Sequence, residues 1–332
     1  FKKKNKIINA FSHKLFFLRC FFILKKFDYY FITYAPESNR IIFFINLILF
    51  YLFCLKNGNK IILRIADTEK YVIKKKDLFY VRFLKYIKYL SIKKIKFLVF
   101  ENKTLEKSFK KKFKRDNFNS IVIRPTNKNF VSLKKYNKNS KLITLGIPGA
   151  IDKMRRDYDY LVRELNKIKI KYRENITIKF IGSSNKIMSN KNFKGSTLSI
   201  SDNFMDKISK MGFRVISNNK GFISRNEYSS MMKGVDFLID INQKDQGYFF
   251  SKSTGLVTDS YNFSKRMILN KHNDPYLEFN EMSIYYKNLS DGINKVIHKK
   301  FDLKSKKIII GNNFNINKLL INSIWRNTLS IK

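Results

Sequence analysis

The sequence is poor in the residues that build cross-links and zinc sites. Its 332 residues include two cysteines and three histidines. Both cysteines, Cys20 and Cys54, lie in apolar runs, and no Cys-x-x-Cys pair occurs. A disulfide framework or a zinc site needs more of these residues at closer spacing. We therefore expect a reduced, intracellular protein with buried thiols.

Glycine is also scarce, with 12 residues in the whole chain. No Gly-x-Gly-x-x-Gly follows a first strand, and no Gly-x-x-x-x-Gly-Lys-Ser/Thr occurs. These glycine patterns let the backbone wrap around a dinucleotide or a triphosphate. Their absence argues against a dehydrogenase and against a P-loop enzyme.

Acidic side chains are outnumbered by basic ones, 25 to 68, which gives a formal net charge of +43. Three explanations compete: binding to nucleic acid, binding to an anionic membrane surface, and AT-rich codons that favour lysine. Lysine is spread along the whole chain, and no RNA-recognition, KH or helix-turn-helix signature is present. A nucleic-acid partner is therefore not favoured.

No apolar run reaches the roughly 20 residues that a helix needs to span a bilayer. The most apolar run, residues 41–55, is interrupted by Asn46 and predicts a buried helix. Residues 1–26 alternate lysine and apolar clusters, and the helical spacing of apolar residues over Ala10–Leu24 predicts an amphipathic helix. Its basic, aromatic face either stays in water or rests on anionic lipid. The chain starts at Phe1 rather than methionine, as expected of a fragment without its natural start.

The first half alternates between apolar runs of strand length and segments with helical spacing, which predicts a parallel, doubly wound α/β sheet. The predicted strands are 28–34, 60–66, 96–100 and 119–124, and the predicted helices 41–55, 77–90 and 105–113. Asp67 follows strand 60–66 at its carboxyl end, where ligands bind in such sheets. Residues 126–140 are polar and predict a linker, so we place the first domain at 1–138.

The second half shows the same alternation and predicts a second domain at 139–315. The predicted strands are 141–147, 175–182, 213–217, 236–242, 266–270 and 282–286, and the predicted helices 156–170, 203–212, 224–234 and 290–298. Ser224 and Glu227 match a capping box. A final helix at 316–332, with Trp325, is expected to pack back toward the first domain.

A polar, glycine-containing loop and a short helix at 247–263 follow strand 236–242. Ser251, Ser253 and Thr254 can cap that helix and donate to phosphate, and Gly255 permits close backbone approach. Lys252 supplies charge. Asp259, one turn inside the helix, is suited to accept from ribose hydroxyls. A strand, a loop and a helix N-terminus in this order are typical of an anion site, here a nucleotide-sugar site.

A second basic feature, Arg155-Arg156, stands at the start of helix 156–170, after strand 141–147 and the Pro148-Gly149 turn. Guanidinium groups beside a helix N-terminus suit a diphosphate. The alternative is surface pairing with Asp157 or Asp159.

Three stretches together resemble glycosyltransferases of group 1, the family with a Glu-x7-Glu motif. They are LGIPGAIDKMRRDYDYLV, GFISRNEYSSMMKGVDFLIDI and YFFSKSTGLVTDSYNFSKRMIL, and the likeness covers roughly 141–300. The resemblance implies an α/β fold of GT-B type, with two Rossmann-like, doubly wound parallel-sheet domains facing a cleft.

The resemblance also implies roles for single residues. Asp259 takes the place of the second motif Glu, which contacts the nucleotide ribose. The diphosphate would face Arg155, Arg156, Lys252, Ser253, Thr254 and Gly255. Phe222 and Ile223 lie where the family holds the nucleobase, and Gly149 and Gly182 complete the donor set. Ser251 stands at the first motif Glu, Arg266 replaces a proline, and Ala66-Asp67 stands where many relatives carry a histidine on the acceptor side.

The function implied by the resemblance is hexosyl transfer from a nucleotide sugar to a glycan or lipid-linked acceptor, in surface polysaccharide or glycoconjugate synthesis. Arg155, Arg156 and Lys252 would stabilise the leaving diphosphate without a metal, and no cofactor would be permanently bound. The expected place is the cytoplasm, at the inner face of the membrane. Two alternatives stay open: a degenerate, non-catalytic partner in glycan assembly, and a basic nucleic-acid-binding protein.

Overall fold

A computed structural model describes residues 30–32, 41–73, 77–113, 118–123, 130–133, 142–151, 155–183, 201–218, 223–242, 254–298 and 306–309. The chain divides into two compact units. The first holds Phe1–Ile123 with Phe250–Ser253, and the second holds Arg124–Phe249 with Thr254–Lys332. The domain boundaries proposed from the sequence, at 138 and 315, stay predictions.

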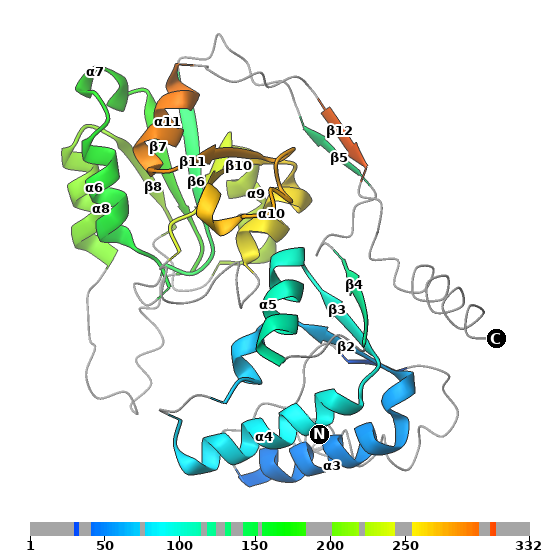
Figure 1. The fold of residues 1–332 in the computed structure, drawn as a ribbon. Coiled ribbons are helices and arrows are strands. Elements are labelled where there is room, and N and C mark those ends of the chain that lie inside the picture. The colour runs from blue at the N-terminus through cyan, green and yellow to red at the C-terminus, as the bar shows by residue number, and fades with distance from the viewer. Residues whose placement is uncertain are drawn as a thin grey trace, which may run out of the picture. The chain divides into compact units, whose positions relative to one another are not determined.

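The first unit contains a four-stranded parallel sheet whose strands follow chain order (Figure 1). The strands are β1 (Tyr30–Ile32), β2 (Ile61–Ile65), β3 (Phe97–Phe100) and β4 (Asn119–Val122). The helices are α3 (Ile41–Asn57), η2 (Gly58–Lys60), η3 (Thr68–Lys70), α4 (Phe79–Lys94) and α5 (Lys103–Phe113). The strands and helices predicted for this half are confirmed within a few residues at each end.

One hydrophobic core holds the first unit together. It joins Phe50 of α3, Ile87 of α4 and Phe109 of α5 to Leu63 and Phe100 of the sheet. All three helices therefore cover the same face of the sheet, as right-handed crossovers between strands in chain order require.

Helix α3 is the predicted apolar helix, and it is only partly buried. Leu47 and Phe50 are fully buried, whereas Ile45 and Leu55 are exposed. Cys54 lies in the core, and burial raises the pKa of its thiol. Within the described ranges, no helix is long and apolar enough to cross a membrane.

The second unit contains a six-stranded parallel sheet in the order β11-β10-β9-β6-β7-β8. Its strands are β6 (Ile143–Pro148), β7 (Ile176–Ile181), β8 (Arg214–Ser217), β9 (Phe237–Ile239), β10 (Arg266–Asn270) and β11 (Ser283–Tyr286). From β6 the chain builds toward one edge, and from β9 it builds toward the other. The order therefore reverses between β6 and β9.

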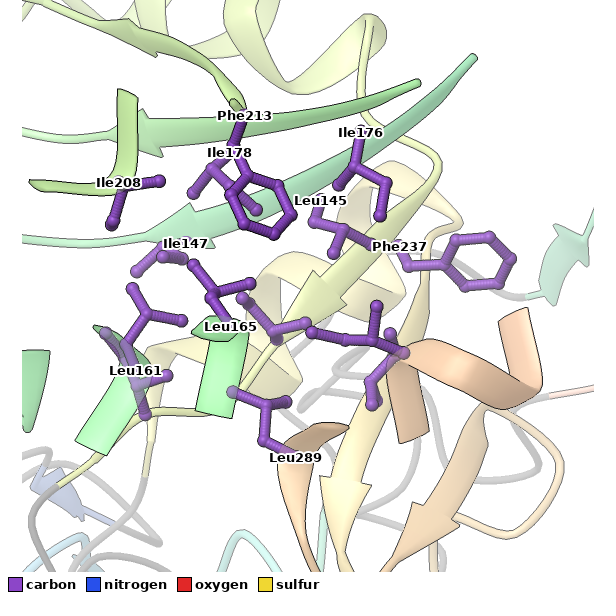
Figure 2. Close-up of a cluster of buried hydrophobic side chains, with 14 of the residues drawn as sticks. Leu145, Ile147, Leu161, Leu165, Ile176, Ile178, Ile208, Phe213, Phe237 and Leu289 are labelled. Atoms are coloured by element: carbon purple, nitrogen blue, oxygen red, sulfur yellow. The ribbon is translucent and has the colours of Figure 1, made fainter. Parts of the chain in front are cut away.

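Helices cover both faces of this sheet. They are α6 (Tyr158–Asn166), α7 (Ile170–Arg173), α8 (Ser201–Lys210), α9 (Arg225–Lys233), α10 (Gly255–Phe263), η6 (Lys271–Asn273) and α11 (Leu289–Ile297). On one face Leu161, Ile208 and Leu289 pack against strand residues such as Ile178 (Figure 2). On the other face Met232 of α9 and Tyr261 of α10 pack beneath Leu238 of β9 and Met267 of β10. The sheet is doubly wound, as predicted.

Two differences from the predicted elements stand out. The single helix expected at 156–170 is broken into α6 and α7. The expected linker contains a strand, β5 (Phe130–Leu133), which pairs antiparallel with β12 (Lys306–Ile309). Val131 and Leu133 alternate with the exposed Ser132, the period of a half-buried strand. The predicted helices at 10–24 and 316–332 lie outside the described residues.

The core of the second unit should be sensitive to a shortened Leu161, which is fully buried. Leu161→Ala leaves a cavity beneath α6 and should lower the free energy of unfolding by about 3 kcal/mol. Ile170→Ala is the control, because Ile170 is 78% exposed and should cost little. Urea unfolding followed by circular dichroism measures both. Equal losses in the two variants would contradict the packing described here.

Candidate functional site

The carboxyl ends of β6 and β9 form the candidate site. These central strands are neighbours, with Leu145 opposite Phe237 and Gly146 opposite Leu238. Because the strand order reverses between them, the segments that follow them leave in opposite directions. Open α/β sheets bind ligands at this switch point.

Arg156 joins the segments that leave the two strands. Its Nη2 donates to the carbonyl of Pro148 at 2.5 Å, and its Nη1 donates to Oδ1 of Asn242 at 2.6 Å. The backbones of Arg156 and Asn242 form an isolated antiparallel bridge, and Asp157 N donates to the Ile241 carbonyl at 2.8 Å. Arg156 is 9% exposed. Its charge therefore sits inside the switch point, where it acts on nearby carboxylates with little screening.

Asn242 also contacts Thr254, the N-cap residue of helix α10. Its Nδ2 lies 3.5 Å from Thr254 Oγ1, and Thr254 caps the helix by accepting from Leu256 N at 3.3 Å. Gly255 is the first helical residue, and a Cβ built on it would meet none of the described atoms within 4 Å. Among the described residues, none therefore fills the space beside Gly255 at the N-terminus of α10, where backbone N–H groups favour an anion.

The two predicted glycines have packing reasons. Gly149 has a φ of +97°, and a Cβ there would lie 2.6 Å from Nη2 of Arg156. A Cβ on Gly182, after β7, would lie 2.0 Å from the Gly149 carbonyl oxygen. Both positions therefore need glycine to let the backbones and the guanidinium approach.

Asp259 faces this site from one turn inside α10. Tyr228 of α9 donates its hydroxyl to Asp259 Oδ2 at 2.6 Å. Burial raises the pKa of Asp259 to about 6, although the Tyr228 hydrogen bond and the Arg156 charge work in the opposite direction. Burial, together with the Asp259 carboxylate, raises the pKa of Tyr228, so the tyrosine stays a hydrogen-bond donor.

A second carboxylate, Asp240, lies just after β9 and is 2% exposed. It accepts from Asn242 N at 3.0 Å and from Asn273 Nδ2 at 2.6 Å. Burial raises its pKa, while these hydrogen bonds and the Arg156 charge oppose the rise. Asp240 orients the loop that carries Asn242 and faces Asn273 rather than open space.

The structure places part of the predicted set at the switch point: Gly149, Arg156, Gly182, Thr254, Gly255 and Asp259. Arg155 is exposed beside Arg156, and Ile223 is half-buried before the capping box of Ser224 and Glu227, which is present. Phe222, Ser251, Lys252 and Ser253 lie outside the described residues. In the first unit, Asp67 caps η3 by accepting from Glu69 N at 2.9 Å.

Three residues of the site were not singled out from the sequence: Tyr228, Asp240 and Asn242. Tyr228 lies within the predicted helix 224–234, and its spacing to Met231 and Met232 gives no sign of a role in a site. Asp240 and Asn242 were counted within an apolar strand. Their polarity at a strand's carboxyl end was the available signal. The described residues contain no group of three or more His, Cys, Asp or Glu side chains placed to hold a metal ion.

Comparison with known proteins identifies the fold. No family model matches the chain. The α,α-trehalose-phosphate synthase (UDP-forming) of Burkholderia xenovorans, solved with glucose-6-phosphate, matches with a TM-score of 0.51 and 7% identity, over 96% of this chain and 75% of that one. The trehalose-6-phosphate synthase of Burkholderia multivorans matches with a TM-score of 0.51 and 9% identity, over 96% and 74%. The chain has the GT-B architecture of these enzymes, two Rossmann-like α/β units.

One curated protein, the tRNA modification GTPase MnmE of Carsonella ruddii (strain PV), is 26% identical over 169 residues. The match spans 50% of this chain but only 35% of that protein. The P-loop pattern of a nucleoside triphosphatase does not occur in the present sequence.

The raised pKa of Asp259 predicts a pH-dependent stability. The folded pKa, about 6, exceeds the value of roughly 3.9 expected in the unfolded chain. The folded state therefore binds more protons between these values, so this carboxyl's contribution to stability is complete below about pH 4 and is lost as the pH rises through 6.

The substitution Asp259→Asn should remove the loss of stability that this carboxyl causes as the pH rises through 6. Urea unfolding at several pH values between 4 and 7 should show the variant gaining stability relative to the wild type as pH rises. The other carboxyls titrate in both proteins, so the difference isolates Asp259. A difference that is constant across this range would contradict the raised pKa.

Proposed function

We propose that the chain transfers a sugar from a nucleotide-diphosphate sugar to a glycan or lipid-linked acceptor. The observation that carries the proposal is the switch point of the second unit. There hydrogen bonds join Arg156 through Asn242 to Thr254, the cap of a helix N-terminus, and the half-buried Asp259 lies one turn inside that helix. The fold shared with UDP-forming trehalose-phosphate synthases supports the proposal.

The leaving diphosphate sets the main chemical demand. Negative charge develops on it as the glycosidic bond to the sugar breaks, and fixed dipoles and cations stabilise that charge. The N–H groups at the start of α10, Arg155 and Lys252 would serve this purpose. Arg156 contributes differently, because both of its terminal nitrogens already donate to the protein. Its role is to hold the loops and to add positive charge beneath the diphosphate.

The nucleotide's ribose would bind at Asp259. Its hydroxyls would donate to the carboxylate, which accepts them more strongly when it is ionised. Tyr228 donates to Oδ2 and leaves Oδ1 for the ribose. We therefore assign Tyr228 as the residue that orients Asp259. Phe222 and Ile223 would flank the nucleobase.

The acceptor is assigned to the first unit, on the strength of the GT-B architecture. Asp67 stands after β2, at the carboxyl end of its sheet. Because its carboxylate caps η3, it would position the loop for an acceptor. A hexosyl donor and a role in surface polysaccharide or glycoconjugate synthesis remain part of the proposal.

A nucleotide panel tests the donor site. Thermal unfolding of the chain should shift upward with one of UDP, GDP, CMP and ADP, because a ligand at 100 times its Kd stabilises by about 2.7 kcal/mol. Arg155→Ala should abolish most of the shift, since Arg155 is exposed and its loss leaves the fold intact. Lys169→Ala, an equally exposed basic residue beyond the other end of α6, should keep it.

A shift with a DNA duplex alone, removed by salt, would contradict the proposal and favour nucleic-acid binding. Binding of a nucleotide without any turnover of its sugar conjugates would favour the non-catalytic alternative.

The ribose contact has its own test. The wild type should bind the preferred ribonucleotide more tightly than its 2′-deoxy analogue, by about tenfold, the value of one hydrogen bond to a charged group. Asp259→Asn should lose most of this preference, and Tyr228→Phe should reduce it and shift its pH dependence upward. Titration calorimetry at pH 5 and pH 7.5 measures all three proteins. An unchanged preference in Asp259→Asn would exclude Asp259 as the ribose ligand.

A further inference from the structure

The outward side of helix α4 has an unusual composition for a helix in water. Phe79 is 87% exposed, Phe83 47% and Tyr86 49%. Spacings of four and three residues place these rings on one side of the helix. The other side, with Ile92 and with Ile87 at its border, packs into the core of the first unit. The helix is therefore aromatic on the side where a soluble protein normally carries polar residues.

Neither the proposed donor site nor the packing of the first unit accounts for these rings. The described residues of the donor site belong to the second unit. The core of the first unit is formed by the other side of α4 together with α3 and α5.

The charges on this side of α4 all have one sign. Arg82 is exposed within the aromatic stripe, and Lys93 and Lys94 are exposed at the end of the helix. The sequence FYVRFLKYIKYLSIKK contains no acidic residue. Lys93 Nζ also lies 4.6 Å from the centre of the Tyr89 ring. The surface thus combines exposed rings with cations.

The neighbouring helix α3 also exposes apolar side chains and lacks acidic residues. Helices α3 and α4 lie side by side (Figure 1). Helix α3 has no acidic residue either, and it exposes Ile45, Leu52 and Leu55. The two helices together carry exposed apolar side chains and cations without a single carboxylate.

We propose that the outward side of α4, formed by Phe79, Arg82, Phe83, Tyr86, Lys93 and Lys94, docks on an anionic phospholipid bilayer. Charge complementarity selects this occupant. The rings would enter the boundary between headgroups and acyl chains, and the cations would bind the lipid phosphates. A second copy of the chain fits poorly, because pairing would bring Arg82, Lys93 and Lys94 against the same cations.

Docking of this kind would hold the first unit at a membrane surface, where a lipid-linked acceptor is found. The inference does not depend on the donor site, because the binding it predicts needs no nucleotide. Its failure and the failure of the proposed function would therefore be seen in separate experiments.

Vesicle flotation tests the proposal with the full chain. Vesicles that mix phosphatidylcholine with phosphatidylglycerol should carry the wild type upward, and vesicles of pure phosphatidylcholine should not. Phe79→Ser with Phe83→Ser should weaken binding to the anionic vesicles by about tenfold, since two rings no longer enter the interface. Lys93→Glu with Lys94→Glu should weaken it as well and reduce its salt dependence.

Tyr276→Ser with Ile170→Ser is the matched control, because both residues are exposed but belong to the second unit. It should bind like the wild type. Thermal unfolding checks that the serine variants keep their fold, as expected for exposed positions.

A third measurement reports whether the side chain at position 86 enters the apolar part of the bilayer. Tyr86→Trp, in a chain whose only tryptophan, Trp325, is replaced by phenylalanine, should show a blue-shifted emission on anionic vesicles. Equal binding of the wild type and Phe79→Ser with Phe83→Ser would overturn the proposal and leave non-specific attraction by the net charge. A concentration-dependent dimer that becomes a monomer in this variant, with no vesicle binding, would overturn it in favour of self-association.

Discussion

The buried guanidinium of Arg156 ties together the two strands at which the larger sheet changes direction. It reaches the end of β6 through the Pro148 carbonyl and the segment after β9 through Asn242. Asn242 in turn reaches Thr254, the cap of α10. A charged donor with two partners fixes geometry more strictly than a neutral one. The position of the helix N-terminus, and thus of any anion it binds, depends on this chain of contacts.

The same charge governs the carboxylates around it. Asp240 and Asp259 are both drawn toward protonation by burial, and the positive Arg156 opposes this for each of them. The two differ in what they face. Asp240 accepts from Asn242 and Asn273, whereas Asp259 accepts from the hydroxyl of Tyr228. One carboxylate thus shapes the loop, and the other is suited to meet a ligand.

Local features of the sequence predicted most of the fold. Apolar runs of strand length located the strands, and Ser224 with Glu227 located the start of α9. Thr254 and Gly255 likewise located the start of α10, which placed Asp259 one turn inside it. These signals lie within a few residues of the feature they predict, so they can be recognised without knowing the strand order.

Contacts between distant segments were not predictable in the same way. The Arg156–Asn242 bond joins residues 86 positions apart, and the Tyr228–Asp259 bond joins residues 31 apart. Which side chains meet depends on the order of strands and on helix rotation. The pairing of β5 with β12 shows the same limit, since two four-residue strands far apart carry no local sign of each other.

That ribbon of β5 and β12 has a mechanical consequence. The chain arrives at Phe130 and departs from Ile309, and these two residues are partners at the same end of the ribbon. Tension applied along the chain would act across this pair first. The hydrogen bonds would then break one after another, as in unzipping, rather than all at once in shear. The ribbon would open at low force, before tension reaches the six parallel strands that lie between its two halves in the chain.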